Sequence, residues 1–343
     1  MKAMLLAAGE GTRLRPLTAL RPKPLVPLLN RPMIHHALDA LRAAGVTEVI
    51  ANAWYLAEAL VGRLGAGPPE GPRLQWSVEP ELLGTGGGLR HAAAFFDGCD
   101  DFLLFNGDVL LLADLSAAVE AHRASGAAAT LIVTRRPDLP KALHKVAWDP
   151  GTGRVVEVDG VPALHGPGFA RGIYTGVLVG SPALIEALPP SGAACLKEDG
   201  MWPLLRSGAA LHACESSAYW SDIGSPESYL RTHEDLLDDP DLGRLLPADT
   251  IEVEDGVHAH KAARIDDEAV LRGPALIGPE TIIQAGATVG PHAVIGARCT
   301  LPPGSRVERS VVWDGVIVAG VAVDQVWWPQ GVLTAPRSTP SRR

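Results

Sequence analysis

The chain has 343 residues, with 30 Lys and Arg against 39 Asp and Glu and a formal net charge of −9, and its length predicts two domains at roughly 100 to 200 residues each. The acidic balance argues against a nucleic-acid or anionic-membrane partner, although a local phosphate pocket is compatible with it. Four scattered cysteines, no recognisable leader and no long apolar run predict a reduced, cytoplasmic protein without a membrane anchor.

The first predicted element is a buried strand over Met4–Ala8, which breaks into a loop with glycines at positions 9 and 11. Glycine lets backbone N–H groups approach an anion closely, so this loop predicts a phosphate-binding site. The loop continues with a hydroxyl, basic side chains and prolines that forbid a helix: Thr12; Arg13, Arg15, Arg21 and Lys23; Pro16, Pro22, Pro24 and Pro27.

Two common phosphate motifs do not fit this loop. A Walker loop requires Gly-Lys-Ser/Thr, but Gly11 is followed by Thr-Arg, and the dinucleotide fingerprint requires a third glycine where the chain has Leu14. The stretches Leu5–Thr18 and Pro22–Pro24 instead resemble the signature of the sugar-1-phosphate nucleotidyltransferases. The resemblance implies an enzyme that transfers a nucleotidyl group from a nucleoside triphosphate to a sugar 1-phosphate, with Mg²⁺ as cofactor.

After the loop, predicted helices and strands alternate. Apolar residues at helical spacing predict a helix over Arg31–Ala44, with Asn30 as its N-cap. Strands are then predicted at Glu48–Ala53, Arg73–Val78, Phe102–Phe105 and Ala128–Thr134, and helices at Tyr55–Leu64, Thr85–Phe96 and Leu115–Ala124. This βαβ alternation predicts an α/β fold with a doubly wound, Rossmann-like mixed sheet.

Between Pro137 and Gly172 the pattern weakens into short strands at Lys145–Trp148 and Arg154–Val158, which we interpret as an antiparallel insert over the pocket. The later predicted elements are a strand at Ile173–Gly180, helices after Pro182 and at Asp199–Ser207, a strand at Leu211–Cys214 and a helix from Glu227 to about Leu237, with Ser225 as its N-cap and Pro226 at its first position. We therefore predict a nucleotidyltransferase domain over residues 1–239 and an acidic linker over 240–250.

From residue 251 the sequence has a different period. Aliphatic residues fall six residues apart without a slip: Ile265, Leu271, Ile277, Ile283, Val289, Ile295, Leu301 and Val307. A small residue precedes each of them by two positions. This hexad resembles the hexapeptide repeat of left-handed parallel β-helices, in which three hexads make one coil. We predict such a β-helix over residues 251–334, followed by a loose tail at 335–343.

The family resemblance assigns roles to two basic residues and two aspartates. Arg13 and Lys23 match the arginine and lysine that contact the nucleotide phosphates and the reacting α-phosphate. Asp108 follows a predicted strand at the end where α/β sheets bind ligands, and Asp222 lies in Trp-Ser-Asp-Ile-Gly. The resemblance implies that these two carboxylates hold Mg²⁺ together with phosphate oxygens. Arg13, Lys23, Asp108 and Asp222 are therefore the predicted catalytic residues.

The predicted nucleotide site consists of Leu6, Ala7, Ala8, Gly9, Gly11, Thr12, Arg13, Lys23, Glu79, Gly84, Thr85 and Gly107. The carboxylate of Glu79 favours guanine, whose Watson–Crick edge offers adjacent N–H and NH₂ donors, over uracil or thymine. The segment Gly84–Gly88 resembles both guanylyltransferases and N-acetylmuramate 1-phosphate uridylyltransferases, so the base stays open. We predict GTP with mannose 1-phosphate, and the alternative is another nucleotide with heptose, N-acetylmuramate or glucose 1-phosphate.

The sugar side departs from the family pattern. The usual Glu-Lys-Pro is Gly160-Val161-Pro162, so the family's lysine is missing, and the usual Asn-Ala-Gly is Tyr174-Thr175-Gly176. Gly176 keeps a close backbone approach to the sugar. Lys197 is predicted to meet the sugar phosphate and Glu198 a sugar hydroxyl, although one residue more than the family pattern blurs the register of this segment.

Two other functions stay open. The missing lysine is compatible with a non-catalytic regulatory subunit that binds an NDP-sugar, and acyl transfer at the β-helix would need His258, His260 or His292 as base. We favour turn positions for these histidines, because each lies at a predicted corner without an acyl-donor motif. Retention of both metal aspartates favours the enzyme, and we also expect assembly into a homo-oligomer.

Overall fold

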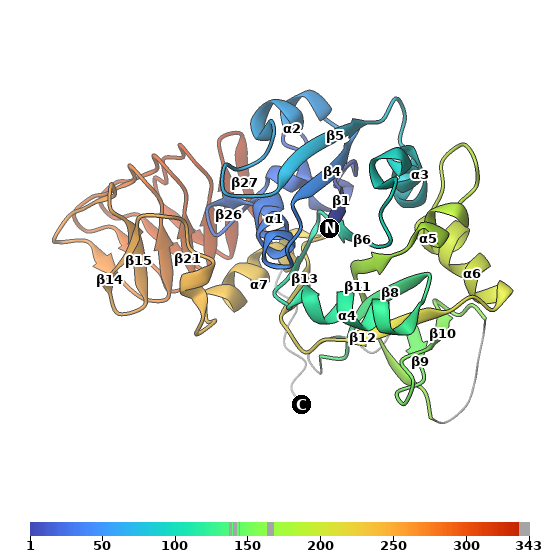
Figure 1. Cartoon of the computed structure of the whole chain (residues 1–343). Coiled ribbons are helices and arrows are strands. Elements are labelled where there is room, and N and C mark those ends of the chain that lie inside the picture. Colours follow the sequence, from blue (N-terminus) through green and yellow to red (C-terminus); the bar gives the residue numbers. More distant parts are fainter. Residues whose placement is uncertain (137–138, 140–142, 144, 163–167, 336–343) are drawn as a thin grey trace. The chain divides into compact units, whose positions relative to one another are not determined.

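The structure is a computed structural model, and it describes residues 1–136, 139, 143, 145–162 and 168–335. The chain forms two compact units. The first comprises Met1–Gly11, Thr18–Leu25 and Met33–Asp222, and the second comprises Thr12–Leu17, Val26–Pro32 and Ile223–Arg343. Figure 1 shows an α/β sheet with its helices in the first unit and stacked short strands in the second.

A nine-stranded mixed sheet forms the centre of the first unit. Its strands are β1 (Lys2–Leu6), β4 (Glu48–Ala53), β5 (Arg73–Val78), β6 (Phe102–Asn106), β8 (Ala129–Thr134), β9 (Val146–Trp148), β10 (Val155–Val158), β11 (Ala170–Gly180) and β12 (Leu211–Glu215). The order is β10-β9-β11-β6-β1-β4-β5, and β8 joins β12 to β11. Strands β6, β1, β4 and β5 run parallel, whereas β11 is antiparallel to β6 and β8. The predicted doubly wound mixed sheet is confirmed.

Helices cover both faces of this sheet, because its central strands are apolar on both sides. The unit contains α1 (Met33–Ala43), α2 (Ala57–Leu64), α3 (Gly84–His91), α4 (Leu115–Ser125), α5 (Pro182–Glu186), the π-helix η5 (Leu196–Met201), α6 (Trp202–Ser207) and the 3₁₀ turns η2 (Lys23–Leu25) and η3 (Ala93–Phe96). Leu38 of α1 and Leu115 of α4 belong to one hydrophobic cluster. Leu89 of α3 and Leu204 of α6 belong to a second. Alternate residues of β1 enter the two clusters.

Most elements of this unit agree closely with the sequence prediction. The strands predicted at 48–53 and 73–78 have those bounds as β4 and β5. The helix predicted over 85–96 is two elements, because the glycine-rich α3 ends at His91 and a 3₁₀ turn follows. The antiparallel insert is confirmed for β9 and β10, which pair with each other, while β9 also pairs with β11. Residues 137–138, 140–142, 144 and 163–167 of the predicted insert lie outside the described residues.

The second unit contains the predicted left-handed parallel β-helix. Its strands are β15 (Val257–His260), β16 (Arg264–Ile265), β17 (Val270–Leu271), β18 (Ala275–Ile277), β19 (Ile282–Ile283), β20 (Thr288–Val289), β21 (Ala293–Ile295), β22 (Thr300–Leu301), β23 (Arg306–Glu308), β24 (Ser310–Val312), β25 (Val321–Val323) and β26 (Gln325–Trp328), with antiparallel β14 (Thr250–Glu254) and β27 (Gly331–Thr334) at the ends. Val257 pairs with Ala275, and Ala275 pairs with Ala293, so one coil takes three hexads. The hexad positions from Ile277 to Val307 form the buried core of this β-helix.

Helix α7 (Pro226–Leu237) belongs to the second unit, together with the turns η1 (Thr12–Leu14) and η6 (Leu242–Arg244) and the short strands β2 (Pro27–Leu28) and β3 (Arg31–Pro32). Ser225 caps α7 as predicted and forms a capping box with Ser228. The hydroxyl of Tyr229 donates to the carbonyl of Pro27 at 2.6 Å and accepts from Nε1 of Trp313 at 3.1 Å. These contacts explain why α7 groups with the β-helix, whereas the domain boundary predicted from the sequence lies at residues 240–250.

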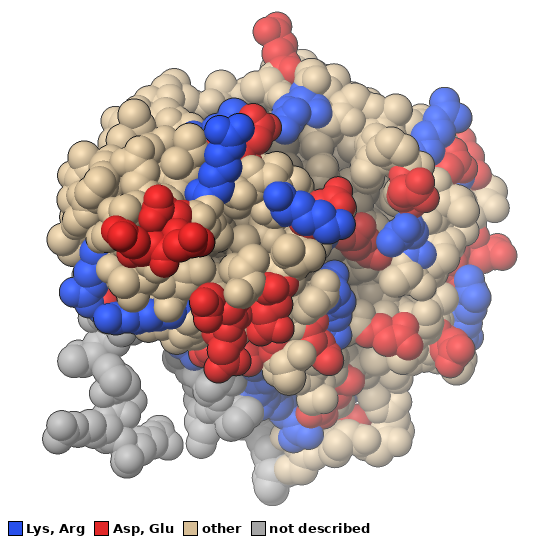
Figure 2. Space-filling model, turned by 90° about the vertical axis from the view of Figure 1, so that its left-hand side faces the viewer, with Lys and Arg blue, Asp and Glu red and all other residues tan. Residues whose placement is uncertain are grey.

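One face of the molecule carries charged groups of both signs. On the face drawn in Figure 2, acidic and basic side chains are interspersed across otherwise uncharged surface. Within the ranges that the structure describes, no helix combines the length and the apolarity needed to span a bilayer. Residues 336–343 of the predicted tail lie outside the described residues.

Candidate active site

The carboxyl ends of β1 and β6 form the centre of the candidate site. The predicted phosphate loop begins where β1 ends at Leu6. The amide of Gly107 donates to the carbonyl of Leu6 at 2.9 Å, and a Cβ at position 107 would lie only 2.8 Å from that carbonyl oxygen. Only glycine fits this approach, so the turn that carries Asp108 packs directly on the start of the loop.

Lys23 and Asp108 form an ion pair, with 2.9 Å between Nζ and Oδ2. The lysine side chain is 8% exposed and the aspartate side chain 36%, so a buried cation faces a half-exposed carboxylate. Gly11 packs against Lys23 and Thr18. It has φ +63°, and a Cβ at this position would come within 3.1 Å of side-chain atoms of both residues. The hydroxyl of Thr18 donates to the carbonyl of Gly11 at 2.8 Å. The loop thus holds the ammonium group of Lys23 against the carboxylate at the end of β6.

Asp222 is brought beside Asp108 by a two-stranded ladder. Strand β7 (Val109–Leu111) pairs antiparallel with β13 (Trp220–Asp222), and Asp222 lies opposite Val109. Residues opposite each other in such a ladder are about 5 Å apart, so the two aspartates occupy neighbouring backbone positions. The Oδ1 atom of Asp222 is buried. The structure therefore brings together three of the predicted catalytic residues: Lys23, Asp108 and Asp222.

Arg13, the fourth predicted catalytic residue, belongs to the second unit and lies in the exposed turn η1. A Cβ at Gly224 would lie 2.7 Å from Nη1 of Arg13, so the guanidinium group rests against the backbone of Gly224. Thr12 precedes it in the same turn and is exposed. The phosphate contacts of Arg13 and Thr12 stay predictions.

On the nucleotide side, Glu79 follows β5 and is 3% exposed. Its Oε1 atom accepts from Nδ2 of Asn52 at 2.7 Å, and its Oε2 atom accepts from the amide of Leu83 at 3.0 Å. Oδ1 of Asn52 accepts in turn from the amide of Ala7 at 2.6 Å. Asn52 is not predicted from the sequence, because an Asn inside an apolar strand carries no motif. Protein donors already hold both oxygens of Glu79, and its contact with a base stays a prediction.

The glycine-rich helix α3 packs on the segment that leads to Lys197. Gly84 has φ +72°, and a Cβ there would lie 2.6 Å from the carbonyl of Ala194. The hydroxyl of Thr85 accepts from the amide of Leu196 at 2.9 Å. Two residues predicted to line the nucleotide site therefore also hold the predicted sugar-phosphate segment in place.

On the sugar side, Lys197 forms an ion pair with Asp159, which also accepts from Nζ of Lys145 at 2.9 Å. Two hydrogen bonds hold the pKa of Asp159 below its ordinary value, and the one from Lys197 has a larger effect than the one from Lys145. Asp159 in turn raises the pKa of Lys197. The pairs therefore persist as the pH falls through the ordinary carboxyl range and are lost only below it. Two cationic groups thus stand on this side although the family's lysine, expected at Val161, is missing.

The π-helix η5 carries Lys197 and Glu198. A π turn accommodates one residue more than an α turn. Oδ2 of Asp199 accepts from the amide of Cys195 at 2.7 Å and so closes the start of the turn. Lys197 is half-buried and Glu198 exposed, and their substrate contacts stay predictions.

Strand β11 carries Gly176 and Tyr174. Gly176 has φ +86°, and a Cβ there would lie 2.8 Å from Nδ2 of Asn106, so this glycine lets β11 approach the end of β6. The hydroxyl of Tyr174 is buried and, among the residues that the structure describes, has no hydrogen-bond partner. Burial raises the pKa of Tyr174 above its ordinary value. A neutral hydroxyl therefore stands in the position where the family has an amide.

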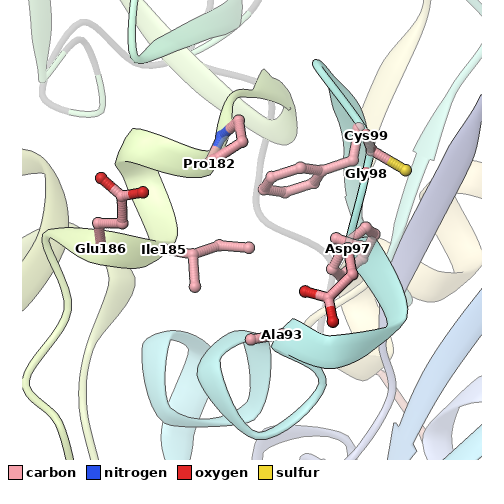
Figure 3. Close-up of a pocket in the computed structure, with 9 residues that line it drawn as sticks. Ala93, Asp97, Gly98, Cys99, Pro182, Ile185 and Glu186 are labelled. Carbon is pink, nitrogen blue, oxygen red and sulfur yellow. The ribbon is translucent and has the colours of Figure 1, made fainter.

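A separate pocket of about 250 Å³ lies at the other end of β6, beside Phe102 (Figure 3). Figure 3 shows Ile185 and Asp97 on opposite walls of it. Phe102 begins β6, whereas Asp108 comes after its last residue. Ligands of open α/β sheets bind beyond the carboxyl ends of the strands. This pocket is therefore not part of the candidate site.

Two of the three histidines considered for acyl transfer lie in a strand. His258 and His260 belong to β15 rather than to a corner, because β14 and β15 form a hairpin at the start of the β-helix. Nδ1 of His260 accepts from the amide of Ala262 at 3.0 Å. His292 has φ +53° in a turn, and its Nε2 lies 2.9 Å from Oδ1 of Asp238.

Comparison with known families decides the class of protein. A family model described as nucleotidyl transferase matches residues 2–239. The chain belongs to the nucleotidyl transferase family. A second model, described as bacterial transferase hexapeptide with six repeats, matches residues 274–309. The predicted enzyme class and the predicted hexapeptide β-helix are both confirmed.

This nucleotidyltransferase has relatives with different named substrates. It is 30% identical over 303 residues to a UTP–glucose-1-phosphate uridylyltransferase of Synechocystis sp., covering 80% of this chain and 78% of that protein. It is also 30% identical over 326 residues to a mannose-1-phosphate guanylyltransferase of Mycobacterium tuberculosis, covering 94% and 83%. The crystal structure of HddC from Yersinia pseudotuberculosis complexed with GMP-PN has a TM-score of 0.56 at 23% identity, covers 68% of this chain and 98% of that chain, and supports the fold alone.

Proposed function

We propose that this nucleotidyltransferase joins GTP and mannose 1-phosphate to form GDP-mannose and pyrophosphate. The observation that carries the proposal is the ion pair of Lys23 and Asp108, with Asp222 beside it, at the carboxyl end of β6. The choice of substrates is supported by the relative from Mycobacterium tuberculosis, whose name is mannose-1-phosphate guanylyltransferase and which matches 94% of this chain.

In the proposed reaction, an oxygen of the sugar 1-phosphate attacks the α-phosphorus of GTP in line. The new P–O bond forms as the bond to pyrophosphate breaks, without a covalent enzyme intermediate. Both reactants are anionic, so cationic groups must be in place before they meet. The ammonium group of Lys23 is held by the carboxylate of Asp108, and the absence of a side chain at Gly11 leaves room for the base of the lysine side chain. Arg13 is proposed to contact the triphosphate, on the strength of its motif.

Asp108 and Asp222 fit the binding of Mg²⁺. This ion takes oxygen ligands and is commonly held by one or two carboxylates together with substrate phosphates and water. Among the described residues no three His, Cys, Asp or Glu side chains gather closely enough to hold a metal by themselves, so phosphate oxygens and water would complete the shell. When bound, the ion offsets the negative charge that develops on the transferred group.

UTP with glucose 1-phosphate is the second candidate, because the relative from Synechocystis sp. is equally similar and carries the name of a glucose-1-phosphate uridylyltransferase. The carboxylate of Glu79 argues only weakly for guanine, since each of its oxygens already accepts one protein hydrogen bond.

The proposal is tested by incubating the protein and Mg²⁺ with each common nucleoside triphosphate and with mannose, glucose, heptose and N-acetylmuramate 1-phosphates. Pyrophosphate release and the mass of the NDP-sugar are measured for every pair. The highest kcat/KM is expected for GTP with mannose 1-phosphate, and a maximum for UTP with glucose 1-phosphate would establish the second candidate instead. No turnover with any pair would support the regulatory subunit, and calorimetry would then measure NDP-sugar binding.

A further inference from the structure

A buried chain of hydrogen bonds crosses the carboxyl ends of β1, β4 and β5 and reaches the start of α3. This strand-end relay consists of the amide of Ala7, the side chains of Asn52 and Glu79, and the amide of Leu83. Its successive donor–acceptor distances are 2.6, 2.7 and 3.0 Å. Asn52 is 2% exposed and Glu79 is 3% exposed, so the protein itself supplies their hydrogen bonds.

A backbone N–H group lies at each end of the relay, so each of the two side chains must turn an acceptor toward its own end. The amide of Ala7 can only donate, so Asn52 turns its oxygen toward Ala7 and its NH₂ group toward Glu79. The amide of Leu83 also can only donate, so with Asn52 in place the side chain at position 79 must accept on both of its oxygens. A carboxylate does this, whereas a carboxamide offers a donor on one side. With an amide at position 52, the relay therefore requires an acid at position 79. Because both ends of the relay donate, an acid at position 52 with an amide at position 79 would satisfy the same groups.

The relay also determines how closely α3 approaches the sheet. Gly88 of α3 lies against it, and a Cβ at that position would be 2.7 Å from both Nδ2 of Asn52 and Oε1 of Glu79. Leu83 immediately precedes α3. The same two side chains thus contact the start of the phosphate loop, at Ala7, and both the beginning and the middle of α3. These two elements line the predicted nucleotide site.

We propose that Asn52 and Glu79 are positioning residues that fix the spacing between the phosphate loop and α3, and so shape the pocket for the nucleotide. Glu79 acts through the amide of Leu83 and not by contact with the base. The inference rests on the proposed function for its kinetic measurements, whereas its measurements of stability are independent of any substrate.

The test exchanges the acid and the amide. Glu79→Gln alone sets an NH₂ group against another donor, and Asn52→Asp alone sets two carboxylates against each other. Each single variant is expected to raise KM for GTP by about tenfold to a hundredfold, the effect of leaving a buried polar group unsatisfied. In the double variant, the carboxylate introduced at position 52 accepts from the amide of Ala7 and from the NH₂ group introduced at position 79. The carboxamide oxygen at position 79 then accepts from the amide of Leu83. The double variant is therefore expected to recover KM for GTP to within about threefold of the wild-type value.

A positioning role predicts which kinetic constants change. KM for GTP should change more than KM for mannose 1-phosphate, because the relay contacts both elements of the predicted nucleotide site, whereas α3 reaches the predicted sugar-phosphate segment through Gly84 and Thr85. A general folding defect would instead lower the fraction of active enzyme and leave KM alone. A double variant no better than the worse single variant would overturn the relay. A changed preference among nucleotides in Glu79→Gln, without rescue by Asn52→Asp, would show direct reading of the base and would also overturn it.

The matched control is Glu81→Gln, which makes the same chemical change on an exposed side chain two residues later and is expected to leave KM and stability unchanged. Thermal unfolding midpoints of the same proteins give a second test: each single variant should lower the midpoint and the double variant should recover it. If the wild type turns over no substrate pair, the proposed function fails while the unfolding cycle still decides the relay. If a single variant does not fold, a folded double variant supports the relay and an unfolded one overturns it.

Discussion

Within the first unit, the nucleotide side and the sugar side of the candidate site are built in different ways. On the nucleotide side, Asn52 and Glu79 are almost fully buried and bonded to backbone amides. On the sugar side, the side chains of Lys145, Asp159 and Lys197 are 59%, 26% and 36% exposed. In the proposed enzyme, the nucleotide would therefore meet a wall whose polar groups are already fixed, whereas the sugar phosphate would meet ion pairs that can exchange partners with it.

The energetic consequences differ in the same way. Leaving one buried polar group unsatisfied costs about 1–3 kcal/mol, so changes on the nucleotide side affect both folding and nucleotide binding. An exposed ion pair contributes only about 0–1 kcal/mol to stability, so changes on the sugar side should affect sugar affinity with little effect on folding. Each of the following variants tests one part of this contrast.

The largest effect is expected at Asp108, which both sides share. Asp108→Asn removes a carboxylate of the predicted metal site and the ion-pair partner of Lys23, so turnover should fall by about a thousandfold or more while the chain still folds. Steady-state pyrophosphate release and a thermal unfolding curve measure the two quantities. Asp100→Asn, on an exposed aspartate, is the control and should behave as wild type. Near-normal turnover in Asp108→Asn would remove this residue from the metal site.

The next effect should come from the nucleotide side. Gly88→Ala places a methyl group 2.7 Å from both Asn52 and Glu79, and overpacking of this kind costs about 1–3 kcal/mol of unfolding free energy. The same substitution should raise KM for GTP by more than it raises KM for mannose 1-phosphate. Gly62→Ala is the matched control, because that glycine lies in α2 with nothing within 4 Å of an added Cβ, and it should raise stability slightly. A Gly88→Ala protein as stable as wild type would show that α3 is free to shift.

The contrast also explains what the sequence could predict. The glycine-rich loop and Asp108 could be placed at the carboxyl end of the sheet, because the motif is contiguous in the chain and Asp108 follows an apolar strand whose end is clear from its composition. The predicted strands at 48–53 and 73–78 have the observed bounds for the same reason. Local patterns of apolar residues and turn residues were sufficient for these features.

The partners of these residues depend on long-range packing and could not be predicted. Asn52 meets Glu79 only because β4 and β5 are adjacent and in register, and no local pattern distinguishes this Asn from others. Lys145 and Lys197 converge on Asp159 from distant parts of the chain. The grouping of α7 with the β-helix likewise depends on contacts such as the one between Tyr229 and Trp313.

A smaller effect, confined to one substrate, is expected on the sugar side. Lys197→Ala should raise KM for mannose 1-phosphate about tenfold by removing a cation from the phosphate, and Lys145→Ala should raise it less, because Lys145 is the more exposed. KM for GTP and the unfolding free energy should stay close to wild type. Lys261→Ala, which breaks an exposed ion pair with Asp249 in the second unit, controls for the loss of a surface charge. A rise in KM for GTP as large as that for the sugar phosphate would break the distinction between the two sides.

The smallest effect is expected at Tyr174, where the substitution should raise the free energy of unfolding instead of lowering it. Tyr174→Phe removes a buried hydroxyl that has no hydrogen-bond partner in the described part of the chain, so the unfolding free energy should rise by about 1 kcal/mol. Tyr55→Phe is the matched control, because the hydroxyl of Tyr55 donates to the carbonyl of Ala19 at 3.0 Å, and its loss should lower stability instead. If the Tyr174 hydroxyl is kept to meet the sugar, the more stable Tyr174→Phe protein will also have a KM for mannose 1-phosphate raised a few-fold. A gain in stability with an unchanged KM would show that this hydroxyl is an unsatisfied group of the core and takes no part in sugar binding.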